Sequence, residues 1–95
     1  MQESEVDMLF KMLEKSIKAD DKTEIINNCS RLLEYSNHLD EKTQVGLFLV
    51  KGISLLKQQH YTLALLNVQR AIEINSNDNK LCLDTLEYVK KKIME

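Results

Sequence analysis

The chain has 95 residues, the size of one small domain, and this leaves no room for a second independent core. Its composition is that of a globular protein, with 43% hydrophobic and 29% charged residues, 2 glycines and no proline. Its 13 Lys and Arg against 15 Asp and Glu give a formal charge of -2, which provides no general attraction to phosphate backbones or anionic lipid. We therefore expect neither nucleic acid nor a membrane as partner.

Apolar residues recur at helical spacing along the chain and do not alternate as in a strand, so the sequence predicts an all-α fold. The first helix is expected over residues 4–19, with Ser4 as its N-cap. A polar break at 20–24 separates it from a second helix, which is expected to end near Asn37 or His38.

Three further helices are expected in the second half of the chain. Asp40 is the expected N-cap of the third, whose run over 45–56 is apolar on nearly every side and must be covered on more than one face. A polar joint at 57–60 leads into a fourth helix, whose apolar stripe runs from Tyr61 to Ile72 and which ends at residues 75–78; a fifth helix begins at about Asn79. About five helices joined by short loops predict antiparallel neighbours.

The segment 45–78 has the residue spacing of a helical repeat. Its bulky and small residues follow in a fixed order, which is Phe48, Gly52, Leu55, Tyr61, Ala64, Val68 and Ala71. This order resembles the tetratricopeptide repeat family and implies two packed antiparallel helices. Gly52 and Ala64 are then the small residues at which the helices approach, while Phe48 and Tyr61 fill the space beside them.

A weaker form of the pattern lies about 35 residues earlier. Its residues are Leu13, Ile17, Ile26, Cys29, Leu33 and Ser36, and Ile17 stands where the small glycine belongs. We therefore expect a single tetratricopeptide-like domain over 1–95, with a degenerate repeat at 4–43, a well-matched repeat at 45–78 and a capping helix at 79–95.

Two narrower resemblances concern the second half of the chain. Gly52, Tyr61, Ala64, Val68 and the tail 77–93 look like the end of the cytosolic domain of mitochondrial fission protein 1, here expected without its membrane anchor. Length, acidity and an apolar helix followed by Tyr61-Thr62-Leu63-Ala64-Leu65 are similar to the small tetratricopeptide chaperones of type III secretion. That second family holds an export substrate in a concave groove, together with another small protein.

The sequence shows no pattern for catalysis, so we expect no catalytic residue, no metal, no cofactor and no enzyme activity. His38 and His60 lie at predicted helix ends, and no Gly-rich phosphate loop or metal-ligand spacing is present. Cys29 and Cys82 lie in separate apolar-periodic segments and are expected to be reduced, buried thiols. The lysine run 90–92 suits the end of a solvated helix.

The third predicted helix provides the candidate binding site. In tetratricopeptide arrays the first helix of each repeat lines a concave groove, and the resemblance assigns to that groove Gly46, Leu49, Val50, Ile53 and Leu56. These positions are apolar, so they cannot bind an acidic peptide tail through charged hydrogen bonds. Either the first or fifth helix covers the stripe, or an amphipathic helix or extended segment of another protein lies there.

Our hypothesis is therefore a small tetratricopeptide-like module that binds and shields an apolar segment of a partner protein, as a chaperone does, within a small hetero-complex. The alternative is self-association, in which the same stripe forms a homodimer and the chain acts as a structural or adaptor protein. The acidic start of the chain and the lack of an apolar run of about 18 residues lead us to expect a cytoplasmic location.

Overall fold

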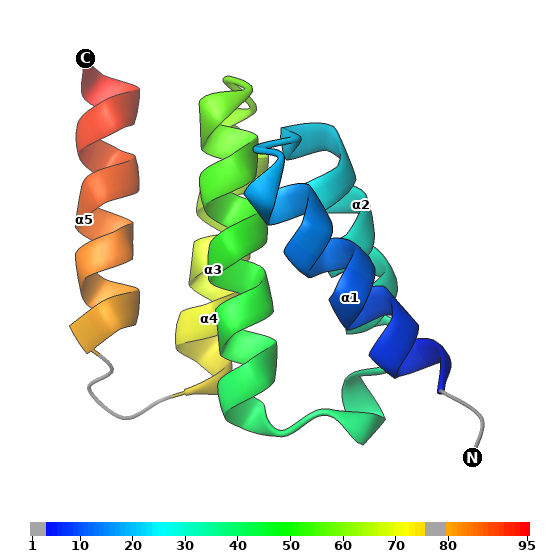
Figure 1. Cartoon of the computed structure of the whole chain (residues 1–95). Helices are drawn as coiled ribbons and strands as arrows, with labels where there is room; N and C mark the ends of the chain where they lie inside the picture. Colours follow the sequence, from blue (N-terminus) through cyan, green and yellow to red (C-terminus); the bar gives the residue numbers. More distant parts are fainter. Residues whose placement is uncertain (1–3, 76–79) are drawn as a thin grey trace.

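The computed structural model describes residues 4–75 and 80–95, and over these residues the chain is all-α with five α-helices and no strand (Figure 1). The helices are α1 (Glu5–Lys18), α2 (Lys22–Leu33), α3 (Glu41–Lys57), α4 (Tyr61–Ile74) and α5 (Lys80–Met94), with a short 3-10 helix, η1 (Ser36–His38), between α2 and α3. This confirms the fold class expected from the sequence. None of the described helices is both long and apolar enough to cross a membrane.

Side-chain caps begin the first three helices, as the sequence predicts for α1 and α3. In each case a side-chain oxygen accepts a hydrogen bond from the backbone N–H three residues later, which satisfies a donor that the helix itself cannot pair. The pairs are Ser4 with Asp7 at 3.1 Å, Asp21 with Glu24 at 3.2 Å and Asp40 with Thr43 at 2.8 Å. The predicted start of the fifth helix, at about Asn79, lies outside the described residues.

The second helix ends at Leu33, a turn earlier than the sequence suggests. The chain tightens into η1 and then passes to α3, where the side-chain amide of Gln44 donates to the carbonyl oxygens of Ser36 and Leu39 at 3.0 and 2.9 Å. Because this one side chain satisfies two carbonyl groups of the connection, the helix can stop without leaving them unpaired.

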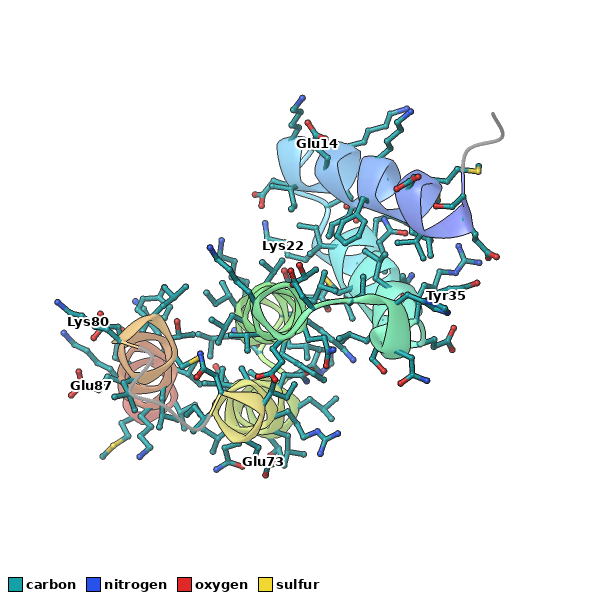
Figure 2. The ribbon with its side chains drawn as sticks, turned by 90° about the horizontal axis from the view of Figure 1, so that it is seen from below. Glu14, Lys22, Tyr35, Glu73, Lys80 and Glu87 are labelled. Atoms are coloured by element: carbon teal, nitrogen blue, oxygen red, sulfur yellow. The ribbon has the colours of Figure 1, made fainter. Side chains whose placement is uncertain are left out.

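Helix α3 lies at the centre of the molecule, with α2, α4 and α5 packed around it (Figures 1 and 2). Two apolar clusters meet on it. The first joins α3, α4 and α5 through Val45, Leu49, Leu55, Leu56, Ala64, Val68, Ala71, Cys82 and Val89. The second joins α1, α2 and α3 through Leu9, Leu13, Ile25, Cys29, Leu32 and Leu47. The expectation that the third helix is covered on more than one face is therefore confirmed.

The turns that join α1 to α2 and α3 to α4 are the same structure, 39 residues apart. Asp20 and Gln59 both have positive φ angles, of 53° and 65°. One backbone hydrogen bond spans each turn in the same way. In the first turn the Asp21 N–H donates to the Ser16 oxygen at 3.0 Å, and in the second the His60 N–H donates to the Leu55 oxygen at 2.9 Å. This is the left-handed ending that commonly closes a helix, and here it gives both helix pairs the same reversal.

Burial repeats with the same spacing. The buried residues of α2 are Ile25, Asn28, Cys29 and Leu32, and those of α4, each 39 positions later, are Ala64, Asn67, Val68 and Ala71. The chain is thus two helix-turn-helix pairs followed by α5. The spacing differs from the alignment of about 35 residues made on the sequence, because the connection through η1 lengthens the first unit. Leu9, rather than Leu13, corresponds to Phe48.

Candidate protein-binding face

The predicted groove residues of α3 fall into three sets. Leu49 and Leu56 are buried in the cluster that also contains Cys82 and Val89 of α5. Each pair is seven residues apart, so the two helices meet along these rows. Helix α5 therefore covers this part of the stripe, which was one of the two alternatives left open by the sequence.

The other three residues lie towards α1 or between the two sides. Val50 is half-buried and packs on the cluster of α1 and α2. Ile53 is also half-buried and Gly46 has open space above it, since a Cβ atom built there would meet nothing within 4 Å. Gly46, Val50 and Ile53 are thus all partly exposed, and of the three only Val50 packs on an apolar cluster.

Helix α5 adds two exposed residues beside this row. Figure 2 views α3 and α5 from their N-terminal ends, so successive residues turn clockwise by about 100°, and it shows Glu87 on the side of α5 away from α3. Tyr88, the next residue, lies about 100° round the helix from Glu87, and Leu81, seven residues before Tyr88, falls on the same stripe of α5. On α3, Ile53 and Gly46 lie beside Leu49, four positions after it and three positions before it.

We call Gly46, Ile53, Leu81 and Tyr88 the α3–α5 face. Leu81 is 62% and Tyr88 45% exposed. The sequence analysis did not single out these two residues, although their spacing of seven on the fifth helix was the signal that could have found them. These four residues carry no charge, but charged side chains surround Tyr88: it shares a shallow hollow of α5 with Asp84, Glu87, Lys90 and Lys91, and Nζ of Lys92 lies 5.7 Å from the centre of its ring.

The repeated architecture does not itself require this apolar surface. The residues of α1 that correspond to Gly46 and Ile53, 39 positions earlier, are Asp7 and Glu14, which are charged and exposed. The same helix-turn-helix geometry therefore forms with carboxylates at these positions. The apolar residues of the α3–α5 face need an explanation other than folding, such as contact with another molecule.

The residues assigned to repeat packing lie mostly where the sequence places them. Gly52, Ala64, Val68 and Ala71 are buried between α3 and α4, and Phe48 is half-buried with the Arg70 guanidinium carbon 6.0 Å from its ring centre. Tyr61 differs, because it opens α4 at the end of the helix pair and is 41% exposed. It does not fill an enclosed space.

Both cysteines are buried in the apolar clusters. Burial raises the pKa of the Cys29 thiol to about 11 and also raises that of Cys82, so both thiols stay protonated near neutral pH. Among the described residues, no group of three or more His, Cys, Asp or Glu could hold a metal ion. His38 ends η1 and His60 directly precedes α4.

Comparisons of the chain with protein-family models, with curated proteins and with solved structures find no match.

Proposed function

We propose that the protein is a non-enzymatic interaction module that binds and shields an apolar segment of another protein on the α3–α5 face. The observation that carries this proposal is that the partly exposed Ile53 and the exposed Leu81 and Tyr88 lie on adjacent parallel helices, while α1 has the charged Glu14 at the position of Ile53. An amphipathic helix fits such a surface, because its own apolar residues also recur at three, four and seven positions.

The residues of the α3–α5 face indicate what kind of partner segment it can bind. Its centre has no charged hydrogen-bond donor, so recognition rests on apolar contact. Lysines at its ends, Lys42 and Lys57 of α3 and Lys92 of α5, favour acidic residues that flank the apolar stripe of the partner. We further propose a tetratricopeptide-type chaperone role in the cytoplasm, as in the type III secretion family that the sequence resembles.

The test is selection of binders from a displayed library of amphipathic-helix peptides. The intact chain should enrich peptides with apolar residues at helical spacing and acidic flanks. Leu81→Asp and Tyr88→Asp should remove this binding, since each places a charge in the apolar contact while altering an already exposed side chain. Circular dichroism checks that both variants keep their helix content.

Leu63→Asp is the matched control. Leu63 is 51% exposed, against 45% for Tyr88, and it lies on α4, which contributes no residue to the α3–α5 face. Its substitution should leave peptide binding unchanged. Enrichment that survives Tyr88→Asp, or that Leu63→Asp removes equally, would contradict the proposed function.

A further inference from the structure

One face of α1 is exposed, whereas the corresponding face of α3, its counterpart in the second helix pair, is buried. Met8 of α1 corresponds to Leu47 of α3, 39 positions later. Leu47 is 4% exposed because α2 packs against it, whereas Met8 is 51% exposed and Met12, one turn on, is 41% exposed. In the described part of the chain no helix takes the place on α1 that α2 takes on α3.

The charges on this face are arranged symmetrically about its centre. Glu5, Met8, Met12 and Lys15 are spaced by three, four and three residues, so they form one stripe along α1. The midpoint between Glu5 and Lys15 is also the midpoint between Met8 and Met12. If a second copy of the stripe runs in the opposite direction, Glu5 of one copy meets Lys15 of the other and Met8 meets Met12.

We infer that this stripe binds a second copy of the chain, with the two α1 helices antiparallel about a two-fold axis. Met8 then packs on Met12 of the other copy, and Glu5 pairs with Lys15 at both ends of the contact. Such an interface is isologous, because the same residues serve on both sides. Antiparallel packing also places opposite ends of the two helix dipoles together.

A depression beside the stripe supports the contact. This depression lies at the N-terminal end of α1, has a volume of about 420 Å³ and is lined by Ser4, Glu5, Val6, Tyr35 and His38. A second depression, of about 340 Å³, lies beside Met12 and Lys15. The flexible methionine side chains of the other copy can enter such shallow spaces. The Glu5 carboxylate lies near the Tyr35 hydroxyl, and its hydrogen-bonding influence and negative charge raise the pKa of Tyr35.

One pair of short helices buries less area than a standard interface, so we expect a weak dimer that dissociates at low concentration. The stripe runs along one flank of α1, beside the two depressions, and shares no residue with the α3–α5 face. This inference does not rest on the proposed function, and either can fail alone.

Sedimentation equilibrium from low micromolar to low millimolar concentration, at low salt, tests the inference. Glu5→Lys and Lys15→Glu each place like charges at both ends of the contact, and each should weaken dimerisation by roughly tenfold. The double variant Glu5→Lys/Lys15→Glu exchanges the charges and should restore the affinity. Restoration is specific to an antiparallel pairing of one stripe with itself.

Glu14→Lys is the control, with the same change of charge on the same helix but on a face where Glu14 pairs with Lys18 at 3.4 Å. It should leave the dimer unchanged. A monomer at every concentration, or a dimer that the single variants do not weaken or the double variant does not restore, would overturn the inference.

Discussion

Both glycines of the chain lie in α3, but a side chain would have open space at Gly46 and close neighbours at Gly52. A Cβ atom at Gly52 would lie 3.1 Å from Cγ2 of Val68 and 3.2 Å from the carbonyl oxygen of Ala64, while one at Gly46 would meet nothing within 4 Å. Val68 is fully buried and the Ala64 oxygen belongs to the backbone of α4, so neither can move away easily. Gly52 is therefore required by close packing, and Gly46 is not.

We predict that Gly46→Ala raises the free energy of unfolding by up to about 1 kcal/mol, the helix preference of alanine over glycine. Gly52→Ala should lack this gain, and Gly52→Leu should lower the free energy of unfolding by roughly 1–3 kcal/mol. Denaturant unfolding followed by circular dichroism measures all three. Equal effects of alanine at both positions would mean that α3 and α4 are not in close contact at Gly52.

The buried thiol of Cys29 predicts a loss of stability at high pH. Its pKa is raised to about 11 in the folded protein, above the ordinary value of 9.0. Above pH 9 the thiol ionises more readily in the unfolded chain than in the folded one, so the free energy of unfolding should fall from about pH 9 to about pH 11. Cys29→Ala should show a smaller fall across this range, since the remaining titrations are common to both proteins. Identical slopes would place the thiol in contact with water.

At the scale of elements, the matched turns give both helix pairs the same geometry at the cost of two left-handed residues. Gln59 has a positive φ without the side-chain ion pair that Asp20 makes with Lys22 at 2.7 Å. Glycine adopts this conformation without the Cβ strain of other residues.

We predict that Gln59→Gly raises the free energy of unfolding by about 0.5–1 kcal/mol, since the relief of strain exceeds the greater entropy of glycine in the unfolded chain. Gln58→Gly is the control: its φ is already negative, at -91°, so it should be destabilising. Thermal unfolding of the two variants measures the difference. A lower melting temperature for Gln59→Gly would contradict the assignment of strain to this turn.

The helices could be predicted from the sequence because each carries its own apolar periodicity, and the first three also carry side-chain caps. The end of α2 could not, since it depends on the hydrogen bonds that Gln44 makes from α3. The candidate site could be predicted only in part, because its exposure also depends on another helix. Periodicity shows that Leu49 and Ile53 are both apolar, but only the placement of α5 decides that Leu49 is buried and Ile53 partly accessible.

At the scale of the whole molecule, α3 belongs to both apolar clusters, whereas α5 belongs to one. Opening α3 must break both clusters, so its amides should exchange with solvent only when the whole chain unfolds. Opening α5 breaks only its contacts with α3 and α4 and leaves the cluster of α1 and α2 in place. We therefore expect α5 to open separately, at a lower free energy.

Hydrogen exchange of two variants distinguishes these routes. Leu32→Ala, in the fully buried centre of the α1–α2 cluster, should cost about 2–5 kcal/mol and speed exchange in α3 by at least tenfold, while leaving the amides of α5 unchanged. Val89→Ala should speed exchange in both helices, because it weakens the docking of α5 and with it the whole fold. If Leu32→Ala also speeds exchange in α5, that helix opens only on global unfolding. A helix that opens alone would expose Leu49 and Leu56 of α3, so the same measurement shows whether α5 can give way and extend the partner-binding face.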